Sequence, residues 1–83
     1  MRFNAEAVIT PREGVLDTQG KAVEKTLTHL GYGSVHDVRV GRIVTLSLEA
    51  ENSEAADEAV RNMCQDLLAN DLIETYKITV REA

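Results

Sequence analysis

Hydrophobic residues change their spacing along this 83-residue chain, and that change limits the folds it can adopt. In residues 2–10 apolar and polar side chains alternate, which places one set on a single side: Phe3, Ala5, Ala7 and Ile9. Alternation with a period of two predicts a β-strand with one face on the core. The single proline, Pro11, is expected to end this strand.

A helix is expected to follow, because three apolar side chains recur at the i, i+4 and i+7 positions of one face: Val23, Leu27 and Leu30. The Asp17 carboxylate can cap it by accepting hydrogen bonds from unpaired backbone N–H groups. Gly20 in the first turn costs about 1 kcal/mol relative to alanine, which predicts a close backbone approach or strain. Gly31 and Gly33 are expected to end the helix, since glycine adopts the left-handed conformation easily.

Residues 35–50 alternate again and predict strand structure. Gly41-Arg42, in the middle of this segment, fits a two-residue type II′ hairpin. The same pair fits a glycine bend or bulge within one long strand. We slightly favour the hairpin, so the sequence leaves three strands or four open.

A second helix is expected from Ser53, a good N-cap, to Asn70, which can take the left-handed C-cap conformation. Its apolar stripe is the strongest periodic signal in the chain: Ala56, Ala59, Val60, Met63, Cys64, Leu67 and Leu68. A last strand follows, in which Tyr76, Ile78 and Val80 alternate with polar residues.

These segments predict a single α+β domain over residues 1–83, a two-layer sandwich of the order β-α-β(β)-α-β. Its sheet has three or four mainly antiparallel strands, with two helices on one face. The other face then meets solvent or a partner. Its side chains are semi-polar strand formers, which suit either role: Glu6, Val8, Thr10, Ile43, Thr45, Ser47, Thr75, Lys77 and Thr79.

Composition favours stabilisation by association. A chain this short buries only about 60–65% of its unfolded surface, and small domains often rely on disulfides, metals or partner subunits. Cys64 is the only cysteine, and with His29 and His36 it gives too few ligands for structural zinc. Contacts with other subunits are therefore the remaining source of additional stability.

Charge and chemistry exclude several function classes. The net charge of −5 and three aromatic residues argue against nucleic-acid binding. No apolar run approaches the ~20 residues of a membrane span, and the lone cysteine and the lack of a signal peptide suggest a cytoplasmic protein. Cys64 is expected in the core, and no catalytic, cofactor-binding or metal site is expected on this chain.

Three segments, residues 14–22 (GVLDTQGKA), 38–42 (VRVGR) and 63–76 (MCQDLLANDLIETY), resemble the PurS family of phosphoribosylformylglycinamidine (FGAM) synthase subunits. The likeness covers essentially the whole chain. Two departures stand at loop or helix-entry positions, Thr18 and Asp71, where that family commonly has proline.

The resemblance implies a non-catalytic subunit of a glutamine-dependent, ATP-using ligase of purine biosynthesis. ATP, Mg and glutamine would be used by partner subunits. The partners implied are other copies of this chain as a dimer or tetramer, a large synthase subunit and a glutaminase subunit, between which ammonia passes.

The same resemblance suggests three groups of subunit-contact residues. They are Asp17, Gln19 and Gly20; Gly41 and Arg42; and Asn70, Glu74 and Tyr76. Several have a competing structural explanation: a cap for Asp17 and Asn70, and a turn for Gly41. The main alternative function is a small-ligand regulatory domain acting as a homodimer, and a stand-alone enzyme lacks any supporting constellation of residues.

Overall fold

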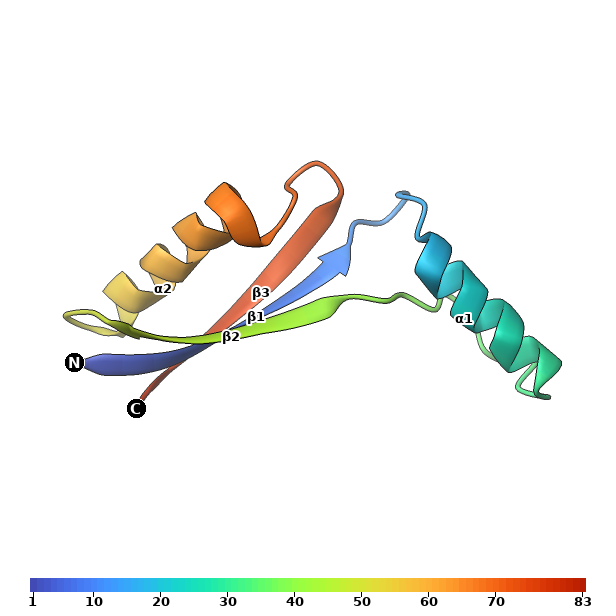
Figure 1. The fold of residues 1–83 in the computed structure, drawn as a ribbon, viewed down its shortest axis with the longest axis horizontal. Helices are drawn as coiled ribbons and strands as arrows, with labels where there is room; N and C mark the ends of the chain where they lie inside the picture. Colours follow the sequence, from blue (N-terminus) through green and yellow to red (C-terminus); the bar gives the residue numbers. More distant parts are fainter.

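The computed structural model describes residues 1–83, with elements in the order β1–α1–β2–α2–η1–β3 (Figure 1). The strands are β1 (Arg2–Pro11), β2 (Arg42–Glu49) and β3 (Glu74–Glu82). The helices are α1 (Thr18–His29), α2 (Ser53–Met63) and the π-helical turn η1 (Cys64–Leu68). The expected α+β class is confirmed. No helix is long and apolar enough to span a bilayer.

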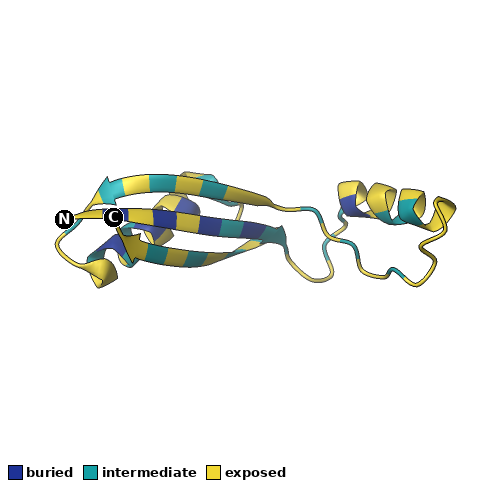
Figure 2. Cartoon of the chain, turned by 90° about the horizontal axis from the view of Figure 1, so that it is seen from below, coloured by how far each residue is buried: buried dark blue, intermediate teal, exposed yellow.

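The three strands form one antiparallel sheet with β1 in the centre, in the order β2–β1–β3. Ala5 of β1 lies opposite Leu46 of β2 and Val80 of β3, so all three point to the same face. The banding of buried and exposed residues along β1 is visible in Figure 2. The period-two pattern of all three strands is therefore confirmed.

A small core lies between this inner face and the second helix. Ala56, Val60 and Cys64 are fully buried, and Val60 and Cys64 pack in one cluster with Ala5, Ala7 and Ile9 of β1. One helix cannot cover three strands, so the inner residues of both edge strands are only half-buried: Val44, Leu46, Leu48, Tyr76, Ile78 and Val80. Packing of Cys64 in the core is confirmed, and burial raises the pKa of its thiol.

The position of α1 differs from the expectation of two helices on one face. α2 covers the sheet, whereas α1 lies beyond the end of the sheet and packs extensively on neither the sheet nor α2 (Figure 1). The molecule measures 50 × 25 × 14 Å, and its radius of gyration is 16.1 Å. A compact chain of this length would have a radius of gyration of about 12 Å. We call residues 12–41, which include α1, the arm.

The expected hairpin at Gly41-Arg42 is wrong, because the chain runs into β2 without reversing direction (Figure 1). The sheet therefore has three strands. Residues before Val40 run past Pro11, the last residue of β1, and so have no neighbouring strand to pair with. The backbone N–H groups of Val38 and Val40 instead donate to the carboxylates of Glu24, at 3.3 Å, and Asp17, at 2.9 Å.

Both ends of the second helix also differ from expectation. Asn52 is the N-cap in place of Ser53, and its side-chain oxygen accepts from the Ala55 N–H at 2.8 Å. At the other end Asn70 is not left-handed, since Asp37 is the only non-glycine residue with positive φ. In η1 the Ala69 N–H donates to the Cys64 carbonyl, five residues back. This wider turn moves Leu67 off the apolar stripe and leaves it 83% exposed.

Candidate subunit-contact surfaces

Asp17 ties the start of α1 to the segment that leads into β2. One carboxylate oxygen accepts from the Gly20 N–H at 2.9 Å, and the other accepts from the Val40 N–H at 2.9 Å. These donors, Gly20 first and Val40 second, hold the pKa of the Asp17 carboxyl below its ordinary value. The expected N-cap is confirmed, and the same side chain fixes the direction of the arm.

Gly20 is buried at this junction, and its lack of a side chain is required there. A Cβ atom would overlap the Val38 carbonyl and the Asp17 carboxylate. The close approach expected from the sequence is confirmed. Gln19 is different: it is exposed, and its side chain makes no hydrogen bond within the chain. Of this first group, only Gln19 has no internal structural role, and the roles of all three residues as partner contacts stay predictions.

Arg42 and Glu74 form a two-pronged ion pair between the start of β2 and the start of β3. The guanidinium nitrogens Nη1 and Nη2 donate to Oε2 and Oε1 of Glu74, at 2.6 and 3.1 Å. The pair lowers the pKa of Glu74 and raises that of Arg42 through the hydrogen bonds they share. Only 17% of the Glu74 side chain is exposed, against half of Arg42.

The same pair closes the turn between α2 and β3. Arg42 Nη2 donates to the Leu68 carbonyl at the end of η1, and Glu74 Oε1 accepts from the Asn70 N–H at 2.8 Å. Asn70 Oδ1 accepts in turn from the Leu72 N–H at 3.1 Å. Three residues predicted in two separate groups, Arg42, Asn70 and Glu74, thus form one hydrogen-bonded corner.

Gly41 and Tyr76 are placed by the sheet itself. A Cβ on Gly41 would overlap the Ile9 carbonyl, so this glycine allows the arm to pass closely by the end of β1. Tyr76 packs half-buried against the hydrophobic core. Both positions have an internal structural role, and their roles as partner contacts stay predictions.

Arg12 is a connecting residue that the sequence did not single out. Its Nε donates to the Asp71 carbonyl, and its N–H donates to the Ile73 carbonyl, both at 2.9 Å. It joins the loop after β1 to the loop before β3. An isolated arginine after a proline gives no periodic signal, so only the folded chain reveals this contact.

The arrangement as a whole holds loops in place and gathers no reactive groups. The Asp17 and Glu74 carboxylates are both engaged by backbone N–H groups. No three histidine, cysteine or acidic residues come together as metal ligands. What the site residues share is control of the arm and of the corner between α2 and β3.

Comparison with known proteins places the whole chain in one family. Residues 4–82 match the family model PurS, described as phosphoribosylformylglycinamidine (FGAM) synthase. The PurS subunit of Bacillus subtilis is 38% identical over 80 residues, covering 96% of this chain and 94% of that protein. The PurS subunit of Methanocaldococcus jannaschii is 34% identical over 80 residues, covering 96% of each chain.

Solved structures agree over the same length. The B. subtilis PurS structure superposes with a TM-score of 0.84 at 37% identity, covering 96% of this chain and 99% of that one. A chain in the structure of PurLQS from Thermotoga maritima gives a TM-score of 0.86 at 31% identity, covering 98% and 99%. The sequence, the fold and the full-length coverage agree: the chain belongs to the PurS family of FGAM synthase subunits.

Proposed function

We propose that this chain is the PurS subunit of an FGAM synthase in purine biosynthesis and contributes assembly rather than chemistry. Its task is to bring an ATP-dependent synthase subunit together with a glutaminase subunit and to support ammonia transfer between them in the cytoplasm. On this proposal ATP, Mg and glutamine bind the partners, and no cofactor or metal binds this chain.

The observation that carries the proposal is the full-length likeness to a chain of the PurLQS structure. The shape of the molecule supports it, because a chain extended over 50 Å presents more contact surface than a compact one. Exposed leucines at Leu16, Leu30, Leu67 and Leu72 add apolar contact area. Self-association as a dimer or tetramer is part of the proposal.

Reconstitution tests it. The chain is mixed with the synthase subunit and the glutaminase subunit from the same source, and FGAM formation is measured with glutamine or with ammonium as nitrogen donor. We expect the glutamine-dependent rate to need this chain, and the ammonium-dependent rate to depend on it far less. An equal glutamine-dependent rate with and without the chain contradicts the proposal. The alternative of a ligand-binding regulatory domain is not favoured by the comparisons.

A further inference from the structure

Three basic side chains line a hollow at the base of the arm. The hollow has a volume of about 130 Å³, and its cations are Arg12, Lys21 and Arg39. They come from three segments: the loop after β1, the start of α1 and the segment that leads into β2. The whole chain has fourteen acidic and nine basic residues, so this gathering of cations differs in sign from the net charge of the molecule.

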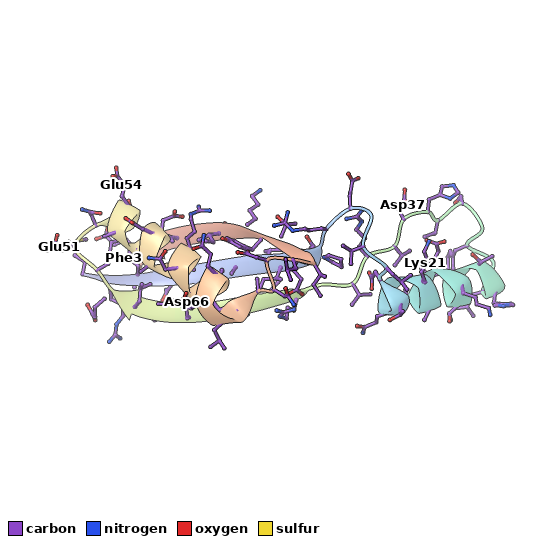
Figure 3. The ribbon with its side chains drawn as sticks, turned by 90° about the horizontal axis from the view of Figure 1, so that it is seen from above. Phe3, Lys21, Asp37, Glu51, Glu54 and Asp66 are labelled. Carbon is purple, nitrogen blue, oxygen red and sulfur yellow. The ribbon has the colours of Figure 1, made fainter.

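Two carboxylates also line the hollow. Asp17 is already engaged, since its oxygens accept from the Gly20 and Val40 N–H groups. Asp37 is exposed and lies on the segment that returns along α1, the helix that carries Lys21 (Figure 3). Neither carboxylate forms an ion pair with the three cations. Among the side chains that line the hollow, three positive charges therefore face two negative ones.

Two of the cations are held in place through only part of their guanidinium groups. Arg12 Nε donates to the Asp71 carbonyl at 2.9 Å, and Arg39 Nη1 donates to the Pro11 carbonyl at 3.0 Å. The other guanidinium nitrogens make no hydrogen bond within the chain. Arg39 Nη2 lies 3.8 Å from a carboxylate oxygen of Glu13, whose side chain is 93% exposed. A guanidinium that is already fixed at one nitrogen loses less conformational entropy when the others bind a ligand.

Lys21 and Leu16 add donors that the chain itself does not use. The Lys21 ammonium forms no ion pair, and the backbone N–H of Leu16, which also lines the hollow, has no acceptor within the chain. Sites for drug-sized ligands have volumes of about 300–1,000 Å³. A hollow of about 130 Å³ therefore admits a single anionic group, and the rest of its ligand stays outside.

We propose that this hollow binds the phosphate group of a small phosphorylated molecule. A phosphate monoester carries about 1.5–2 negative charges at pH 7 and three strong acceptor oxygens, which suits three cations from three segments. A carboxylate has one charge and two oxygens, so it satisfies fewer of these donors. Bound phosphate joins the loop after β1, the start of α1 and the segment before β2, and it thereby holds the arm against the end of the sheet.

The test uses the complete chain without partner subunits, so its outcome is independent of the reconstitution assay. An NMR titration of the backbone amide signals measures both the affinity and the location of binding. The probes are inorganic phosphate, methyl phosphate and, as a carboxylate, acetate, all at constant ionic strength because salt screens exposed charges. Lys21→Gln removes one cation of the hollow without breaking a contact. Lys25→Gln is the matched control, since Lys25 is an exposed lysine of the same helix that does not line the hollow.

We expect the wild type to bind both phosphate probes saturably and to bind acetate at least fivefold more weakly. The phosphate affinity should fall at least fivefold in Lys21→Gln and change less than twofold in Lys25→Gln. The amide signals that move should include those of Leu16 and Arg39. The inference is overturned if phosphate binding does not saturate, if both lysine variants lose affinity equally, if acetate binds as tightly as phosphate, or if the signals that move lie elsewhere in the chain.

A second variant covers the case in which Lys21→Gln does not fold. Arg39→Lys keeps the positive charge and one donor for the Pro11 carbonyl, but it removes the planar group that can present two N–H donors to a phosphate. We expect it to bind both phosphate probes at least threefold more weakly than the wild type. An unchanged phosphate affinity in this variant contradicts the inference.

Discussion

The Arg42–Glu74 pair links three parts of the chain through two side chains. Arg42 reaches from β2 to the end of η1, while Glu74 reaches from β3 to the Asn70 N–H. A lysine at position 42 has a single charged nitrogen and cannot reproduce both prongs of the guanidinium. The corner therefore depends on these particular groups as well as on opposite charge.

Glu74→Gln is expected to weaken folding by roughly 0.5–1 kcal/mol at neutral pH, since the pair is partly exposed. In the wild type the pKa of Glu74 is lower when folded than when unfolded. Its contribution is therefore complete above the ordinary carboxyl pKa and is lost as pH falls through the folded value. Urea unfolding at pH 7 and at pH 3 should show that the free energy of unfolding falls less on acidification in Glu74→Gln than in the wild type. Glu58→Gln, which removes an exposed carboxylate without an ion pair, is the control; an identical pH slope in the two variants would refute the prediction.

Gly20 has no space for a side chain, which gives a second prediction at the scale of one residue. Gly20→Ala gains about 1 kcal/mol of helix propensity, yet its Cβ would overlap the Val38 carbonyl. We expect a net loss of about 1–3 kcal/mol, because the backbone must move or lose the Asp17 contacts. Gly33→Ala serves as the matched control, since open space surrounds that position. The denaturant midpoints of both variants are compared with that of the wild type. A Gly20→Ala variant as stable as the wild type would contradict the prediction and show that the backbone at this junction can move without loss of stability.

Among the elements, the strands were predictable because each has one buried face, and a buried face imposes a period of two on the sequence. Residues 35–41 also alternate, but a strand needs a neighbour, and residues 35–39 lie beyond Pro11, the end of β1. Alternation alone cannot show where the neighbouring strand stops. The position of α1 was missed for a similar reason, since its apolar stripe predicts burial without identifying the surface that covers it.

The candidate site was predictable only in part. Asp17 and Gly20 were recognisable because a cap and a helical glycine have local causes. The meeting of Arg42 with Asn70 and Glu74 depends on which strand ends lie side by side, and that is a property of the sheet order β2–β1–β3. The widened turn η1 gives no sequence signal, so a regular helical period places Leu67 on the apolar stripe of the second helix.

The wider turn η1 changes which residues face the sheet, and this gives a prediction at the scale of the element. Val60→Ala removes fully buried methyl groups and is expected to cost about 2 kcal/mol. Leu67→Ala is expected to change stability by less than about 0.5 kcal/mol, because Leu67 is mostly exposed. Both variants are compared with the wild type by urea unfolding of the isolated chain at one concentration. If Leu67→Ala loses as much stability as Val60→Ala, Leu67 is buried as in the regular helix expected from the sequence, and the prediction is wrong.

At the scale of the whole molecule, only eight of 83 residues are buried, and one of them is a glycine in the arm. A core this small stabilises a single chain weakly, so we expect subunit contacts to supply a share of the stability. Stability that comes from association depends on protein concentration by mass action, whereas stability within one chain does not.

The thermal midpoint of the isolated protein is therefore expected to rise with concentration. For a dimer whose chains unfold as they separate, each tenfold increase adds about 0.7 kcal/mol per chain. In a domain of this length that corresponds to a shift of roughly 3–6 °C. Calorimetry over a hundredfold range of concentration measures the shift. A midpoint of the wild type that does not depend on concentration would mean that the extended chain is stable alone, and would contradict the proposed self-association.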